Sequence, residues 1–129
     1  MKKEERIEEI EKTIEELKLK NEEMPIIVEG KKDRKALRAL GIRGEIIKLN
    51  IGNSISSFCE NFGKKYKKAI ILTDWDRKGG ELCAFLKENF KTNSVRYDDR
   101  IRVKLSYLCA KDIKDVEGLK KFFEKLKKS

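Results

Sequence analysis

The chain has 129 residues, of which 43% are charged and 39% hydrophobic, and its formal net charge is +9. This length favours one compact unit with a real core, and the composition is that of a globular protein and not of a disordered chain. The sequence contains no histidine, which excludes Ser/His and Cys/His nucleophile pairs and leaves carboxylates, lysines, arginines or a metal ion for any chemistry.

The positive charge is unevenly distributed along the chain. Residues 1–24 contain six Lys or Arg and nine Asp or Glu, a net charge of −3, so residues 25–129 carry +12. A body this basic favours a polyanionic partner, most simply nucleic acid. The alternative is a solvated surface rich in lysine and glutamate, as in heat-adapted proteins.

Cysteine use and hydropathy favour a cytoplasmic protein without membrane contact. Cys59, Cys83 and Cys109 are odd in number and far apart, and we expect them to be buried, reduced thiols. No apolar run approaches the roughly 18 to 20 residues of a membrane span, and the acidic N-terminus does not resemble a signal peptide.

Residues 1–24 are predicted to form an amphipathic helix ahead of the main body. Apolar residues recur at steps of three and four, at Ile7, Ile10, Ile14 and Leu17. The resulting stripe is narrow, and oppositely charged residues at i,i+4 spacing support the helix. The stripe either packs on the rest of the chain or pairs with a second copy in a homodimer.

From residue 25 to residue 129, short β-branched runs alternate with helical patterns. The predicted strands are 25–29, 45–49, 68–74 and the weaker 93–97, and the predicted helices between them are 31–40, 54–65 and 78–90. The alternation predicts an α/β fold with a parallel sheet of about four strands flanked by helices. Residues 98–108 fit a strand or a helix, and 115–127 fit a final helix.

Isolated polar residues follow the predicted strands. Glu29 ends the first strand, Asn50 follows the second, and Asp74 and Asp76 end the third. In an open parallel sheet the ligand lies beyond the carboxyl ends of the strands. Carboxylates converging there repel one another without a cation, and Mg²⁺, which prefers oxygen ligands, is the natural candidate, with Mn²⁺ as a substitute. An aspartate that only caps a helix is the simpler alternative.

Glycines and basic residues stand next to these acids. The glycines, which permit turns and close backbone approach to a ligand, are Gly30, Gly52, Gly79 and Gly80. The basic residues, predicted either to hold phosphates or to form a solvated face, are Lys31, Lys32, Arg77 and Lys78. A calcium loop beginning at Asp74 would place Phe85 where a bidentate glutamate is needed, and no P-loop motif occurs. A phosphoryl-accepting aspartate stays open.

Two segments resemble the Toprim domain of topoisomerases, bacterial-type primases, OLD-family nucleases, recombination-repair proteins and the ribonuclease that matures 5S ribosomal RNA. They are IIVEGKKDRKAL (26–37) and AIILTDWDRKGGEL (69–82). The resemblance covers about residues 25–120, and KDIKDVEGL (111–119) is similar to a segment of small stand-alone Toprim proteins. It implies the Rossmann-like Toprim fold and favours a helix at 98–108.

The resemblance also implies roles for individual residues. Glu29 corresponds to the acid/base or metal-linked glutamate, and Asp74 and Asp76 correspond to the Mg²⁺ ligands. Asp33 either matches a further acid of the ribonuclease-like branch or begins a helix. Trp75, where many members carry a small residue or proline, either stacks on a base or fills space beside the strand.

The function expected from these features is Mg²⁺-dependent phosphodiester hydrolysis of RNA or DNA. Topoisomerase and primase activity are not expected, since both need additional domains. Two alternatives stay open. One is a non-catalytic module that binds nucleic acid with the help of Mg²⁺, as a homodimer or as a subunit of a larger complex. The other is phosphoryl transfer to or from a small molecule.

Overall fold

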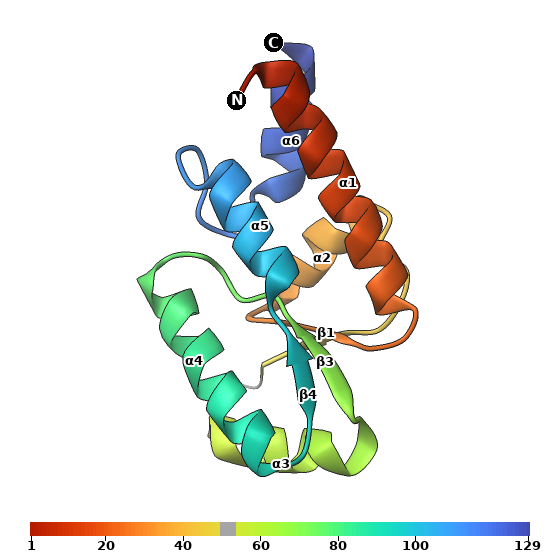
Figure 1. Cartoon of the computed structure of the whole chain (residues 1–129), viewed down its shortest axis with the longest axis vertical. Coiled ribbons are helices and arrows are strands. Elements are labelled where there is room, and N and C mark those ends of the chain that lie inside the picture. Colours follow the sequence, from red (N-terminus) through yellow and green to blue (C-terminus); the bar gives the residue numbers. More distant parts are fainter. Residues whose placement is uncertain (50–53) are drawn as a thin grey trace.

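A four-stranded parallel sheet lies at the centre of the computed structural model, which describes residues 1–49 and 54–129. The strands are β1 (Ile26–Val28), β2 (Ile46–Lys48), β3 (Lys68–Ile71) and β4 (Arg96–Asp98), in the order β2-β1-β3-β4. All three pairings are parallel. The predicted α/β fold with four parallel strands is therefore confirmed (Figure 1).

In the described residues, six helices surround this sheet. They are α1 (Lys3–Asn21), α2 (Lys31–Ala39), α3 (Ile55–Lys65), α4 (Arg77–Thr92), α5 (Arg100–Cys109) and α6 (Leu119–Lys128). Side chains of the central strand alternate between two cores, as the two-residue period of a strand requires. Ile26 and Val28 pack with α1, α2, α5 and α6, whereas Ile27 packs with α3 and α4. Both faces of β1 are thus covered, which explains its wholly apolar sequence.

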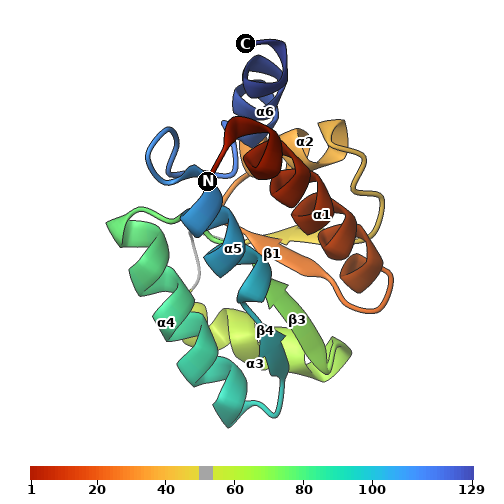
Figure 2. The same cartoon turned by 45° about the horizontal axis from the view of Figure 1, so that its top comes forward.

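The apolar stripe of α1 lies on the body of the protein. Ile10, Ile14 and Leu17 are buried in the same core as α5 and α6, and α1 runs alongside α5 (Figure 2). Two ion pairs join the helices to each other and to β4, Lys104 to Glu16 and Lys20 to Asp98, each at 2.6 Å. Of the two interpretations of the stripe, the structure shows packing within the chain.

Three predicted boundaries in residues 25–129 were wrong by three residues or more. The third strand ends at Ile71 and not at residue 74, because its pairing with β1 ends there. The fourth strand begins at Arg96 and not at residue 93, because Asn93 caps α4 and Ser94 turns the chain with a positive φ of 57°. The last helix begins at Leu119 and not at residue 115, because the Asp115 side chain accepts the Gly118 N–H in a turn at 2.8 Å. Residues 98–108, which fitted two patterns, contain α5.

The three cysteines are free and buried, as predicted. Burial raises the pKa of the Cys59 and Cys109 thiols to about 11, so neither supplies a thiolate at neutral pH. Within residues 1–49 and 54–129, no helix combines the length and the apolar character needed to cross a membrane.

Candidate metal centre

The carboxyl ends of the two central strands bring Glu29 and Asp74 together. Glu29 directly follows β1, and Asp74 lies three residues beyond β3, which pairs with β1 through Ile27 and Ile71. The Glu29 Oε2 atom accepts the backbone N–H of Asp74 at 2.8 Å. The parallel register therefore produces the predicted convergence of the first and third strand ends.

Asp74 is held from two further elements. Its Oδ1 atom accepts the backbone N–H of Val116, in the segment before α6, at 2.9 Å. Its carbonyl oxygen accepts a hydrogen bond from the Arg102 guanidinium of α5 at 2.8 Å, and the same guanidinium donates to the Thr73 carbonyl at 3.1 Å. Chain segments far apart in sequence thus fix the position of this one residue.

Burial raises the pKa of the Asp74 carboxyl to about 7. The Val116 N–H opposes this shift, whereas the negative charges of Glu29, Asp33 and Asp76 add to it. A cation beside these carboxylates would relieve both the burial and the mutual repulsion. The electrostatics of this edge of the sheet therefore favour a bound metal ion.

Asp76 caps α4 and stands in an exposed position. Its Oδ1 atom accepts the N–H of Gly79 at 2.7 Å. Gly79 packs so closely under the preceding loop that a Cβ atom would lie 1.9 Å from the Asp74 carbonyl oxygen. Glycine is thus required at residue 79, whereas a Cβ on Gly80 would have Arg102 as its nearest neighbour at 3.7 Å.

Asp33 is buried beside the same acids and caps α2. Its Oδ2 atom accepts the backbone N–H of Gly30 at 2.9 Å. Burial raises the pKa of the Asp33 carboxyl, and the charges of Glu29, Glu117 and Asp115 act in the same direction. The structure thus supports the helix-start interpretation of Asp33 and adds its charge to the acidic edge.

Trp75 is a packing residue. Only 8% of its surface is exposed, and its indole N–H donates to the Ile113 carbonyl at 2.7 Å. Its backbone N–H donates to the Lys114 carbonyl at 2.9 Å. This burial supports the interpretation of Trp75 as a space-filling residue over that of a stacking platform, and it ties the loop after β3 to residues 113–116.

The oxygen donors at this edge suit Mg²⁺, although they are not gathered into a complete cage. Among the described residues, no three acidic or thiol side chains lie close enough together to hold an ion as they stand. One oxygen each of Glu29, Asp74 and Asp76 is engaged by a backbone N–H, and the other has no hydrogen-bond partner within the described ranges. Mg²⁺ commonly binds through one or two carboxylates, with water and substrate phosphate completing its shell.

The sequence model of the Toprim domain matches residues 25–108, the part of the chain that contains all four strands and the three acids. The chain belongs to the Toprim domain family. Toprim domains generally bind Mg²⁺, and membership indicates metal-dependent processing of nucleic acids in general terms.

Relatives of similar size include archaeal proteins. A UPF0292 protein of Methanocaldococcus jannaschii is 34% identical over 125 residues, which cover 97% of this chain and 98% of the relative. A UPF0292 protein of Methanosarcina acetivorans is 41% identical over 102 residues, or 79% of this chain and 70% of the relative. A solved structure from Aquifex aeolicus is similar with a TM-score of 0.70 and 30% identity, covering 83% of this chain and 94% of that one.

The basic residues predicted to hold phosphates lie at the first turns of two helices of the Toprim fold. Lys31 and Lys32 begin α2, Arg77 and Lys78 begin α4, and all four are exposed. Both helices start directly after an acidic strand end, so their N-terminal amides also face this edge. Gly52 and Asn50, the predicted contributions of the second strand end, lie outside the described residues.

Arg102 and Val116 contact the site, but the sequence did not predict them. Arg102 sits on an amphipathic helix among other basic residues, and its pattern is that of a solvated arginine. Val116 acts through its backbone N–H, which carries no residue-specific signal. The KDIKDVEGL motif, quoted for its resemblance, contains Val116 and was the one available indication that this segment approaches the acids.

Proposed function

We propose that the protein is a Mg²⁺-dependent phosphodiester hydrolase that acts on RNA or DNA. The observation that carries the proposal is the contact of Glu29 with Asp74 across β1 and β3, where burial and neighbouring acids raise the pKa of the Asp74 carboxyl to about 7. Partly buried carboxylates that lie next to one another destabilise the folded state. Such clusters are typical of sites that bind a cation or transfer protons.

Each acidic residue has a distinct part in this proposal. Asp74 and Asp76 would hold Mg²⁺ or Mn²⁺ through their free oxygens, and Glu29 would exchange a proton with the attacking water or the leaving oxygen. The ion, when bound, supplies charge stabilisation at the phosphoryl group. Lys31, Lys32, Arg77 and Lys78 are exposed beside the acids and are suited to hold the flanking phosphates.

A second candidate function is a binding module that cleaves nothing. The observation that favours it is the absence, among residues 1–49 and 54–129, of three donors already gathered around an ion position. The net charge of +12 over residues 25–129 would suffice for sequence-independent binding to phosphates.

The deciding experiment is cleavage of end-labelled structured RNA, single-stranded DNA and duplex DNA with Mg²⁺, with Mn²⁺ or with EDTA. The wild type is compared with Asp74→Asn/Asp76→Asn and with the control Glu60→Gln/Glu88→Gln, which removes two exposed acids from α3 and α4. We expect metal-dependent cleavage that falls by roughly two to three orders of magnitude in the aspartate variant alone.

Two results would contradict the proposal of a hydrolase whose site is this edge of the sheet. If the wild type cuts no polymer but binds it, and binding survives in Asp74→Asn/Asp76→Asn, the binding module is correct. If cleavage persists in that variant after metal removal, the activity does not reside at this edge of the sheet.

A further inference from the structure

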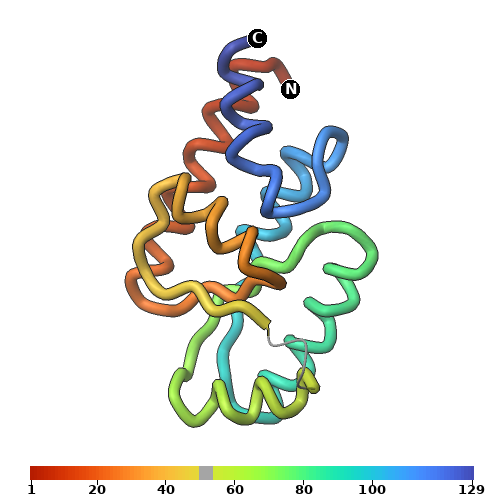
Figure 3. The backbone as a smooth tube through the Cα atoms, turned by 180° about the vertical axis from the view of Figure 1, so that it is seen from behind, coloured from red at the N-terminus to blue at the C-terminus, as the bar shows by residue number. Residues whose placement is uncertain are grey.

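The first half of α6 and the exposed face of α2 enclose an open groove of about 360 Å³. Its lining residues are Lys32, Lys35, Ala36, Glu117, Lys120, Lys121 and Glu124. Helix α6 packs against α2 and extends away from the sheet toward the end of the molecule where both termini lie (Figure 3). We call this feature the lysine groove.

The lysine groove is basic, and part of its charge is uncompensated. Its two glutamates each form an ion pair. Glu117 pairs with Lys32 at the long distance of 4.0 Å, and Glu124 pairs with Lys120 of the same helix at 3.3 Å. These pairs are exposed, so each contributes little and exchanges readily with another anion. Lys35 and Lys121 have no ion-pair partner in the described part of the chain.

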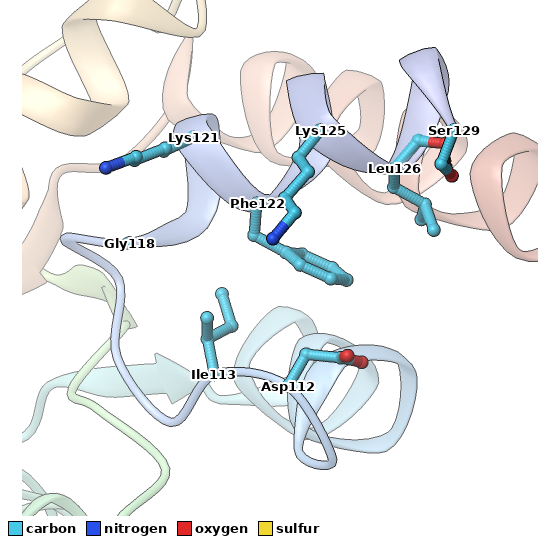
Figure 4. Close-up of a pocket in the computed structure, with 8 residues that line it drawn as sticks. All are labelled: Asp112, Ile113, Gly118, Lys121, Phe122, Lys125, Leu126 and Ser129. Carbon is cyan, nitrogen blue, oxygen red and sulfur yellow. Dashed lines mark hydrogen bonds between the residues drawn. The ribbon is translucent and has the colours of Figure 1, made fainter.

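Helix α6 extends the same charge beyond the groove. It carries the single acid Glu124 against the lysines Lys120, Lys121, Lys125, Lys127 and Lys128. A separate apolar pocket of about 450 Å³ lies on its other side, with Phe122 over Ile113. Figure 4 shows Lys121 projecting from the helix away from Phe122, and Lys121 also lines the lysine groove.

The lysine groove is continuous with the acidic edge. Glu117, which lines the groove, directly follows Val116, whose N–H binds the Asp74 carboxylate at 2.9 Å. On the other wall, Lys32 stands next to Asp33, whose carboxyl accepts the Gly30 N–H beside Glu29. Each wall of the groove is therefore one residue away from a residue that contacts the acidic edge.

We propose that the lysine groove binds the phosphodiester backbone of a nucleic-acid strand and leads it to the Glu29–Asp74 edge. This inference rests on the proposed function, because it names the path by which the substrate reaches that site. Helix α6 lies beyond the residues 25–108 that match the Toprim domain, so one wall of the groove lies outside that match and the other wall, α2, lies within it.

A polymer fits this surface better than a small anion does. The lysines are spread along α6, whose ten residues span about 15 Å at 1.5 Å per residue. That length corresponds to about four nucleotides at 3.4 Å per nucleotide. The groove is also open and has no buried polar side chain aimed into it among the described residues, unlike a pocket that selects one small molecule.

The test is the affinity of Lys35→Glu/Lys121→Glu for fluorescein-labelled single-stranded RNA, single-stranded DNA and duplex DNA. Fluorescence anisotropy in EDTA over a series of KCl concentrations measures binding without cleavage. The matched control is Lys64→Glu/Lys68→Glu, which makes the same charge change at the opposite edge of the sheet, at the end of α3 and the start of β3. All four lysines are exposed, so both variants should fold.

We expect the groove variant to bind roughly tenfold or more weakly at low salt, and the control about as tightly as the wild type. Losing two phosphate contacts should reduce the salt slope by about 1.4 for a single strand or about 1.8 for a duplex. Glu117→Gln, which removes a competing anion, should tighten binding about twofold. The polymer with the largest groove-dependent change identifies RNA or DNA as the ligand.

Several outcomes would overturn the assignment. One is an equal loss of affinity in both double variants, which would mean that the polymer responds to the overall positive charge and not to the groove. Another is unchanged binding in Lys35→Glu/Lys121→Glu, and a third is no binding by the wild type. Groove-dependent binding by a wild-type protein that cuts nothing would support the groove and contradict hydrolysis. If Lys35→Glu/Lys121→Glu cleaves as fast as the wild type at low substrate concentration, hydrolysis is supported and the groove is contradicted.

Discussion

The acidic edge and the lysine groove lie side by side but are built in different ways. At the acidic edge, Glu29, Asp74 and Asp76 each accept a backbone N–H at 2.7 to 2.9 Å, and Arg102 holds the carbonyl of Asp74. In the groove, Lys35 and Lys121 are exposed and make no ion pair with a described residue. One region is fixed by the fold, and the other relies on the number and spacing of charges.

This difference predicts two patterns of response to mutation. Chemistry at a phosphoryl group requires defined positions, so changes in the supports of the acidic edge should have large and abrupt effects. Binding to a phosphate backbone requires only charge of the right sign nearby, so changes in the groove should have graded, salt-dependent effects. The predictions below test whether the acidic edge depends on its supports as closely as the comparison requires.

The largest effect is expected for Gly79→Ala. The added Cβ would lie 1.9 Å from the Asp74 carbonyl oxygen. The backbone of Asp74 cannot move aside without displacing the loop between β3 and α4. We expect a loss of about 3 kcal/mol in the free energy of unfolding, measured by urea denaturation. Gly80→Ala is the matched control and should be neutral or stabilise α4 by up to about 1 kcal/mol. Equal stability of the two variants would show that the loop is adaptable.

A smaller effect is expected for Arg102→Leu. This change removes the hydrogen bonds to the carbonyls of Thr73 and Asp74 and should cost about 2 kcal/mol of unfolding free energy, again by urea denaturation. Arg100→Leu, on the same helix but 76% exposed in its side chain, should cost less than about 0.5 kcal/mol. If the two variants are equally stable, Arg102 does not support the acidic edge.

The sequence predicted the elements that form locally. The β-branched runs around Ile26 and Ile70 and the apolar periods of the helices identified the parallel sheet. It did not predict the late starts of β4 and α6, because these depend on Ser94 and Asp115, whose turns differ little from helix ends in composition. Short polar residues suit both contexts.

For the candidate site, the sequence predicted the residues but not their supports. Glu29 and Asp74 follow buried strands, and parallel strands must end at one edge, so their contact was predictable. The Arg102 and Val116 contacts arise from the docking of α5 and of the segment before α6, which is a tertiary property. The lysine groove likewise joins α2 to α6 across more than eighty residues of sequence, so no local pattern contains it.

The last prediction concerns the charge of Asp74 and carries the smallest expected effect, because the carboxyl is only partly buried and solvent screens much of the penalty. The ordinary carboxyl pKa is 3.8, and the folded protein raises it to about 7. Below about pH 3 both the folded and the unfolded states are protonated, so there is no penalty. Between the unfolded pKa of 3.8 and the folded pKa of about 7, the unfolded state loses its proton first, so folding becomes less favourable as the pH rises. Above about pH 7 both states are ionised, and the folded state bears the whole cost of the partly buried charge.

Thermal unfolding in EDTA should therefore show a Tm for Asp74→Asn that equals that of the wild type at about pH 3 and exceeds it at pH 8 by about 3 to 6 °C. Mg²⁺ should raise the wild-type Tm at pH 8 and leave Asp74→Asn unchanged, because the ion binds only the folded, charged site. Asp76→Asn is the control for the pH effect, since Asp76 is exposed and asparagine caps a helix equally well. A wild-type Tm that does not respond to Mg²⁺ at pH 8 would mean that the acidic edge holds no ion without its substrate.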